Sequence, residues 1–195
     1  MIHYYSKKQE SPLNLKKISA VLRGKKLEFY TGSGVFSKDK IDDGSYILIQ
    51  NAIIRKGWKV LDFGCGYGPV GIAIAKSENA DVLLADVNER AVHLAEKNIE
   101  LNKINAEARI SDLFSNIPEK FDTILLNPPQ SAGKQLCFRM IEESKNHLNK
   151  NGLLQLVARP KKGGKKLAEK MKEVFGNVEV IAKGAGYSVY VSKNS

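Results

Sequence analysis

Three aspartates and one Asn-Pro-Pro segment are the residues of this chain best suited to chemistry. Asp62 and Asp86 each lie at the end of a short apolar run that is typical of a buried strand, and Asp112 follows a third expected strand at 106–110. Asn127-Pro128-Pro129 follows a fourth expected strand. Ligands of parallel α/β sheets bind outside the carboxyl ends of the strands, so these side chains should line one edge of a sheet. Carboxylates there can bind cations and hydroxyl groups, and the Asn and Pro oxygens can accept hydrogen bonds from an amine.

Asp62 precedes a glycine-rich turn, Gly64-Cys65-Gly66-Tyr67-Gly68, and Pro69 then starts a helix. Glycine allows a tight turn and a close ligand, and the free N–H groups of a helix start attract an anion. Residues 66–71 also fit the dinucleotide pattern G-x-G-x-x-G, but Asp62 would repel a pyrophosphate. A ligand with both an ammonium and a carboxylate fits better, and S-adenosylmethionine is such a ligand. A nicotinamide dehydrogenase and a plain βα turn are the alternatives.

The next two aspartates suit the nucleoside part of that ligand. Asp86 lies about 20 residues beyond the glycine turn, where such sheets place a ribose-binding carboxylate. Asp112 could accept a hydrogen bond from the adenine amino group, with Leu113 or Phe114 against the ring. The alternatives are a helix cap or surface acid for Asp86 and a turn residue for Asp112.

Asn127-Pro128-Pro129 suits an amine acceptor. The prolines hold the backbone extended and offer carbonyls without competing N–H groups. The Asn127 side-chain oxygen and the Pro128 carbonyl can then accept both hydrogens of one planar amine and aim its nitrogen at a sulfonium methyl. A sulfonium is a good leaving group, so no strong base is required. The alternative is a rigid exit from the strand.

The elements that would position these residues alternate between strand and helix. We expect a β-hairpin over residues 18–31 with Gly24 in its turn, and a helix from about 43 to 55. The later strands should lie at 60–63, 80–86, 106–110, 121–126 and 153–158, the last after a turn at Asn151-Gly152. The helices should start near 69 and span 89–101, 133–148 (with Leu148 facing inward) and 165–175. Residues 178–182 and 187–191 should form a terminal antiparallel pair. The fold class is therefore α/β, with an N-terminal extension over 1–56 and a core domain over 57–195.

The composition limits the partners. The 195 residues carry a net charge of +10, which permits a polyanionic partner, although a solvated lysine-rich surface is the alternative. Lys161, Lys162, Lys165 and Lys166 form the cluster that we expect to contact phosphate. Cys65 and Cys137 lack metal-ligand spacing, so no metal is expected. Neither a membrane span nor the apolar core of a signal peptide (searched over residues 1–8) is apparent, so we expect a cytoplasmic protein.

With these motifs the chain resembles the "methyltransferase small" family of class I S-adenosylmethionine-dependent methyltransferases. The likeness is carried by Gly34-Val35-Phe36-Ser37, Asp43-Gly44-Ser45, residues 60–71 and Asn127-Pro128-Pro129. The best-known members methylate the exocyclic amine of guanine in ribosomal RNA. The likeness extends to residues 132–134 and 174–178 in compact archaeal single-domain members.

The resemblance implies a Rossmann-like sheet of seven strands with a reversed C-terminal strand. It implies that Asn127 and the Pro-Pro carbonyls hold the target amine, and that Phe36 and Ser37 are candidates for a lid near the cofactor. The alternative for the loop that carries Phe36 and Ser37 is a structural turn. Cys65 would be a small packing residue of the cofactor loop. The implied cofactor contacts are Asp62, Gly64, Gly66, Asp86, Asp112 and Leu113.

Two departures from the family pattern affect the substrate. Gln130 stands where many related enzymes have an aromatic residue that stacks on the target ring, a contact worth about 1–3 kcal/mol per base. We expect no counterpart of the second N-terminal domain of bacterial ribosomal RNA members, so RNA would dock on the N-terminal segment, on the basic loop at 161–166, on a dimer, or on none of these.

We expect methylation of an exocyclic amine, most simply guanine N2 in structured RNA, by a monomer or homodimer. The alternatives are a protein glutamine side chain, adenine in nucleic acid, or RNA binding by a protein whose cofactor pocket is vestigial.

Overall fold

The computed structural model describes residues 13–195. The first half of this range forms β1 (Lys16–Leu22), β2 (Lys25–Thr31), α1 (Asp43–Asn51), β3 (Lys59–Phe63), α2 (Pro69–Ser77), β4 (Asp81–Asp86) and α3 (Glu89–Leu101). The second half forms β5 (Glu107–Ile110), β6 (Phe121–Leu126), α4 (Lys134–Asn146), β7 (Leu148–Ala158), α5 (Gly164–Phe175), β8 (Glu179–Gly184) and β9 (Tyr187–Lys193). Two short 3₁₀ turns, η1 (Gln130–Ala132) and η2 (Pro160–Lys162), precede α4 and α5.

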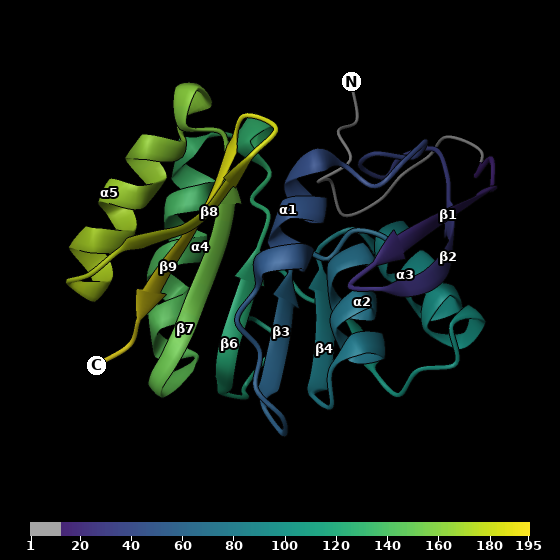
Figure 1. Ribbon diagram of the computed structural model, residues 1–195, viewed down its shortest axis with the longest axis horizontal. Helices are drawn as coiled ribbons and strands as arrows, with labels where there is room; N and C mark the ends of the chain where they lie inside the picture. The colour runs from purple at the N-terminus through teal and green to yellow at the C-terminus, as the bar shows by residue number, and fades with distance from the viewer. Residues whose placement is uncertain (1–12) are drawn as a thin grey trace.

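Seven of the strands form one central sheet in the order β5-β4-β3-β6-β7-β9-β8. β9 pairs antiparallel with both of its neighbours, and the other pairs are parallel. β1 and β2 form a separate two-stranded sheet at one side (Figure 1). This confirms the expected α/β fold, its reversed strand and its N-terminal hairpin. The first 12 residues of the expected extension, with the segment searched for a signal peptide, lie outside the described residues.

Two apolar cores form because successive side chains of a strand point to opposite faces of the sheet. Val60 packs on the face covered by α1, α2, α3 and the hairpin. Leu61, its neighbour, packs on the face covered by α4 and α5. Strands buried on both faces read as continuous apolar runs, which is the pattern that the sequence shows. The helices thereby hold the sheet rigid and leave its carboxyl edge open for a site.

The hairpin is attached to the core by two asparagines of α3. Asn98 Nδ2 donates to the Tyr30 carbonyl at 2.9 Å, and its Oδ1 accepts the Tyr30 N–H at 2.6 Å. Asn102 makes the same pair of bonds with Glu28 at 2.7 and 3.2 Å. The side-chain amides take the place of a missing neighbouring strand and satisfy the edge of β2, which would otherwise be buried with unpaired groups.

α1 ends at Asn51, so the expected continuation to residue 55 was wrong. Ala52 leaves the helical conformation with a ψ of 132°, and Ile53 pairs with a distant side chain. Gln155 Oε1 accepts the Ile53 N–H at 2.9 Å, and Gln155 Nε2 donates to the Ile53 carbonyl at 2.7 Å. These tertiary bonds satisfy the chain beyond α1 in place of another helical turn.

The boundary between α4 and β7 also differs from the expectation. The helix stops at Asn146, and Leu148, which was expected on its inner face, is the first residue of β7. Asn151 (φ 65°) and Gly152 lie inside the strand and not in a turn before it. The pairing moves from Phe121↔Leu148 to Thr123↔Leu153, so the extra residues form a bulge.

None of the helices in the described part of the chain combines the length and the apolar character needed to cross a bilayer.

Candidate active site

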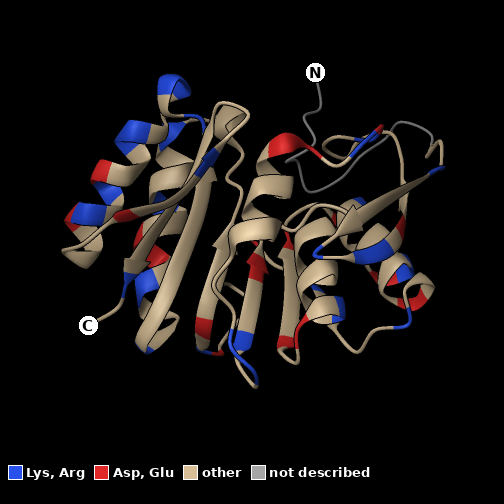
Figure 2. Ribbon diagram, viewed as in Figure 1, with Lys and Arg blue, Asp and Glu red and all other residues tan. Residues whose placement is uncertain are grey.

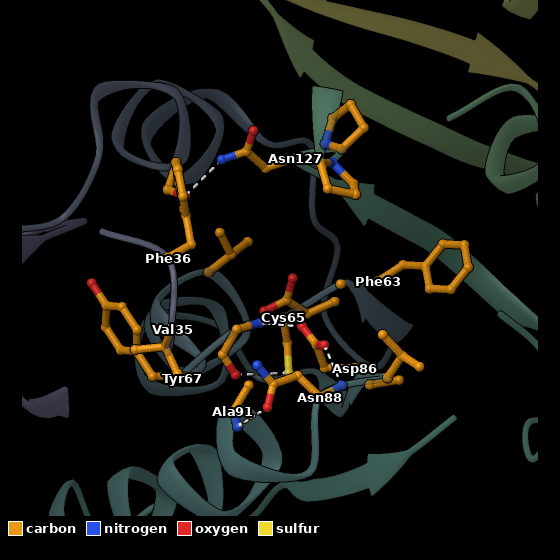
Figure 3. Close-up of a pocket in the computed structure, with 18 of the residues that line it drawn as sticks. Val35, Phe36, Phe63, Cys65, Tyr67, Asp86, Asn88, Ala91 and Asn127 are labelled. Carbon is orange, nitrogen blue, oxygen red and sulfur yellow. Dashed lines mark hydrogen bonds between the residues drawn. The ribbon is translucent and has the colours of Figure 1, made fainter. Parts of the chain in front are cut away.

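A pocket of about 350 Å³ lies at the carboxyl ends of β3, β4 and β6, a size typical of small-molecule sites. The glycine turn after β3 forms one wall, and Asn127 after β6 lies across the cavity from Asp86 and Asn88 (Figure 3). The sheet therefore brings the side chains expected at its edge into one cavity. They are Asp62, Gly64, Cys65, Gly66, Asp86, Asp112, Leu113, Asn127, Pro128 and Pro129, with Phe36 and Ser37 from the loop before α1.

The glycine turn is closed by backbone bonds and open toward the pocket. The N–H groups of Gly64 and Cys65 both donate to the Ala85 carbonyl, at 2.8 and 2.9 Å. Gly66 has a positive φ of 56°, and nothing lies within 4 Å of where its Cβ would be. Gly68 is the opposite case, because a Cβ there would be 2.9 Å from side-chain carbons of Ile72 and Leu84. Gly68 thus serves packing, whereas Gly66 leaves room for a ligand.

Asp62 is a buried carboxylate with one oxygen to spare. Its Oδ2 accepts the Gly71 N–H of α2 at 2.8 Å, and none of the described residues donates to its Oδ1. Burial raises the pKa of Asp62 to about 7, against the effect of the Gly71 bond, and repulsion from Asp86 adds to the rise. A cation beside Oδ1 would favour the ionised carboxylate.

Asp86 joins the glycine turn to the start of α3. Its Oδ2 accepts the Gly66 N–H and its Oδ1 the Asn88 N–H, both at 2.9 Å. Burial raises the pKa of Asp86, and these backbone bonds oppose the rise. Each oxygen keeps a further lone pair, so the carboxylate can still accept hydroxyl hydrogens from a ligand.

Cys65 is buried, and burial raises the pKa of its thiol well above the ordinary value. The thiolate is therefore disfavoured, which agrees with a packing role and not with a nucleophile.

Of the residues after β5, Asp112 and Leu113 line the pocket, whereas Phe114 packs in the core. Asp112 is exposed at the pocket wall, and Leu113 is buried beside it with a φ of 51°. Phe114 does not line the pocket; its ring stacks on His147 with centroids 3.9 Å apart and also contacts Phe63. Of the two apolar residues considered for the adenine ring, Leu113 lines the pocket and Phe114 does not.

The loop that carries Phe36 and Ser37 is bonded to Asn88 and to Tyr67 of the glycine turn. Asn88, which also caps α3, donates from Nδ2 to the Gly34 carbonyl at 3.0 Å. The Tyr67 hydroxyl donates to the Ser37 carbonyl at 3.4 Å. Phe36 keeps 43% of its surface exposed at the mouth of the pocket. Sequence reasoning identified Asn88 as a helix cap. It missed that Asn88 also holds the Phe36 loop, because that bond joins residues 54 positions apart.

The Asn127 amide is fixed in one orientation. Its Nδ2 donates to Ser45 Oγ at 3.0 Å and to Asp42 Oδ1 at 3.3 Å. Asp42 Oδ1 also accepts the Ser45 N–H as the cap of α1, so this oxygen is an acceptor and the amide nitrogen must face it. None of the described residues donates to Asn127 Oδ1, which remains an acceptor. Sequence reasoning missed Asp42 altogether and noted Ser45 only in the Asp43-Gly44-Ser45 motif.

The two proline carbonyls are partly used within the loop. The Pro128 carbonyl accepts the Gln130 N–H and the Pro129 carbonyl accepts the Ala132 N–H, both at 2.8 Å. An amine at Pro128 would therefore share that carbonyl with Gln130 and use its second lone pair.

Gln130 and the expected lysine cluster lie beside this loop. Gln130 Nε2 donates to the Lys162 carbonyl at 3.0 Å, which joins the Asn-Pro-Pro loop to η2. The side chains of the cluster, Lys161, Lys162, Lys165 and Lys166, are all exposed. Figure 2 shows basic residues gathered around the start of α5, whereas acidic residues mark the ends of β3 and β4. Among residues 13–195 no group of His, Cys, Asp or Glu is arranged to hold a metal ion.

Comparison with known proteins identifies relatives over nearly the whole chain. A family model described as "Methyltransferase small domain" matches residues 26–191. YbxB of Bacillus subtilis is 40% identical over 198 residues, and the alignment covers 98% of this chain and 98% of YbxB. Ribosomal RNA small subunit methyltransferase C of Hamiltonella defensa is 35% identical, with 97% of this chain and 57% of that protein covered.

The fold comparison agrees with these relatives. The structure of the T. thermophilus 16S rRNA N2 G1207 methyltransferase (RsmC), in complex with AdoMet and guanosine, matches with a TM-score of 0.83 at 26% identity. The match covers 96% of this chain and 53% of that one. This chain thus spans little more than half the length of the ribosomal RNA methyltransferases that it matches.

Proposed function

Because the chain belongs to the methyltransferase small domain family, we propose that it is an S-adenosylmethionine-dependent enzyme that methylates the exocyclic N2 amine of guanine in ribosomal RNA. The observation that carries this proposal is the fixed Asn127 amide, whose nitrogen is held by α1 and whose oxygen is left to accept an amine hydrogen.

The pocket suits the cofactor on chemical grounds. The spare oxygen of the buried Asp62 matches an ammonium group, and the open side of Gly66 leaves room for a close ligand. Asp86 can accept the ribose hydroxyls, while Asp112 and Leu113 can meet the adenine edge and face. When bound, the cofactor supplies an electrophilic methyl group. The remaining contributions come from residues of the chain itself.

Asn127 and Pro128 act by holding the target amine. Their oxygens accept its two hydrogens, which orients the nitrogen lone pair and removes the entropy cost of alignment during reaction. Positive charge develops on the amine as it forms its new bond, and the two acceptor dipoles stabilise that charge. Because Asp42 and Ser45 fix Asn127 before any substrate binds, little reorganisation is needed.

Ribosomal RNA is favoured as the substrate by the relatives and by charge. Several relatives at 31–35% identity are named ribosomal RNA small subunit methyltransferase C, and the matched T. thermophilus structure contains guanosine. The net charge of +10 suits a polyanion. An enzyme acting on ribosomal RNA would work in the cytoplasm.

The proposal is tested by incubating the protein and tritiated S-adenosylmethionine with total RNA, DNA and protein fractions. We expect label in ribosomal RNA, and N2-methylguanosine by mass spectrometry of its nucleosides. Label in DNA would indicate that the substrate is adenine and not guanine. Label on protein would indicate a glutamine side chain. RNA binding without label in any fraction would indicate a vestigial pocket.

A further inference from the structure

A second groove lies beside the active site, between η2 and the turn that joins β8 to β9. It has a volume of about 510 Å³ and is distinct from the cofactor pocket, with no lining residue in common. We call it the basic groove; its lining includes Arg159, Lys161, Lys162, Lys183 and Tyr187, and none of its lining residues is acidic.

Arg159 is a residue of the basic groove with an unsatisfied hydrogen-bond donor. Its Nε is buried, and no hydrogen-bond acceptor in the described part of the chain lies within reach. Its guanidinium lies over the Tyr187 ring, 4.6 Å from the centroid. A buried N–H without an acceptor is destabilising, so a small shift of the Arg159 side chain toward an acceptor in the groove would relieve that cost.

Tyr187 connects the basic groove to the residues that hold Asn127. The tyrosine ring lies directly against Gly44, where a Cβ would be only 2.8 Å from Tyr187 Cε1. Gly44 stands between Asp42 and Ser45, the two residues bonded to the Asn127 amide. The Gln130–Lys162 bond makes a second connection, from the Asn-Pro-Pro loop. The basic groove therefore lies next to the residues that surround Asn127, within reach of a polymer bound there.

From this geometry we propose that the basic groove binds a backbone phosphate of the substrate RNA next to the methylated nucleotide, an inference that rests on the function proposed above. The planar guanidinium of Arg159 offers N–H groups in a fork that matches phosphate oxygens, and Lys183 and Lys161 add charge. A stacked base is less suitable, because Arg159 already covers one face of Tyr187 and Gly44 lies against the ring.

The test compares Arg159→Gln and Lys183→Gln with Lys150→Gln, a control on an exposed lysine near the start of β7, away from the carboxyl edge. Binding of a fluorescein-labelled hairpin RNA with guanines in its loop is followed by anisotropy at several salt concentrations. Each groove variant should raise Kd roughly tenfold and make the salt dependence shallower by about one unit, because one phosphate contact is lost. The control should stay within about twofold, and calorimetric binding of S-adenosylmethionine should be unchanged in all three.

Two further variants separate charge from packing. Arg159→Lys keeps the charge but not the fork, so its Kd should lie between those of the wild type and Arg159→Gln. Lys183 is exposed, so its variant tests the groove even if Arg159→Gln lowers the melting temperature. If the wild type methylates RNA and the groove variants bind RNA as tightly as the control, the phosphate-binding role of the groove is disproved and the proposed function is not. A wild-type protein that neither binds nor methylates RNA would overturn the proposed function as well.

Discussion

The cofactor side and the basic groove satisfy their polar groups in opposite ways. On the cofactor side the carboxylates of Asp62 and Asp86 already accept backbone N–H groups from the glycine turn and the helix starts. In the basic groove Arg159 Nε lacks a partner among the described residues, and the lysines are exposed. The first arrangement is preorganised for one small molecule of fixed shape. The second suits a flexible polyanion that brings its own acceptors.

Asn127 lies between these two regions and should give the largest effect. Asn127→Ala removes the oxygen that we propose stabilises the developing charge, so kcat should fall by about 100- to 1000-fold. The Kd for S-adenosylmethionine should change by no more than about twofold, because Asp62 and Asp86 are untouched. Initial rates with saturating RNA, together with calorimetry, measure both quantities.

The control is Asn146→Ala, at the exposed end of α4. An Asn127→Ala enzyme with a near-normal kcat, or one that has lost cofactor binding, would contradict the separation of the two regions.

Asp62→Asn should weaken cofactor binding and abolish its pH dependence. Asparagine can still accept the Gly71 N–H but cannot balance an ammonium charge, so Kd should rise about 30-fold or more. The pKa of Asp62 is raised to about 7 by burial, and a cation binds only the ionised form. Wild-type affinity should therefore weaken by about tenfold per unit as the pH falls below 7, whereas the variant should be nearly flat between pH 5.5 and 7.

Stability without cofactor provides a check on Asp62. The folded protein keeps the Asp62 proton up to about pH 7, whereas the unfolded chain loses it near pH 4. The folded state thus binds more protons in this window, and the contribution of Asp62 to the free energy of unfolding falls as the pH rises. Thermal melting of Asp62→Asn should lack that decline, and an identical decline in both proteins would disprove the raised pKa.

Replacing one glycine with positive φ in each region by alanine tests how tightly the two regions are packed. Gly68→Ala puts a Cβ 2.9 Å from Ile72 and Leu84, so it should lower the free energy of unfolding by about 2–4 kcal/mol. Gly186→Ala, in the turn beside the basic groove, meets nothing within 4 Å and should lose only about 1 kcal/mol from backbone strain. Urea unfolding followed by circular dichroism measures both. Equal losses would show that crowding does not distinguish the regions.

The smallest effect is expected from Lys165 and Lys166, which lie outside the basic groove on the first turn of α5. Because these lysines lie outside the groove and act on the RNA only as nearby charges, each replacement by glutamine should weaken RNA binding by only about threefold. The kcat at saturating RNA should be unchanged. A loss as large as that of Arg159→Gln would mean that the phosphate contacts are spread over the whole basic cluster.

The sequence identified those pocket residues that belong to short local motifs. The glycine turn, the strand-end acids and Asn-Pro-Pro are short segments, and a parallel sheet necessarily brings its strand ends together. The residues that orient these motifs could not be predicted from the sequence, because they lie far from them along the chain. Asp42 lies 85 positions from Asn127, and Gln155 lies 102 positions from Ile53. Such pairs exist only after the layers pack, which is also why the ends of α1 and α4 were misplaced.

Asp42 serves two structures at once, because the oxygen that caps α1 also accepts from the Asn127 amide. Fraying of the first helical turn would move this oxygen and free the amide to rotate. Moderate warming should therefore abolish methyl transfer while the sheet is still folded, because a helix end unfolds before the buried strands do.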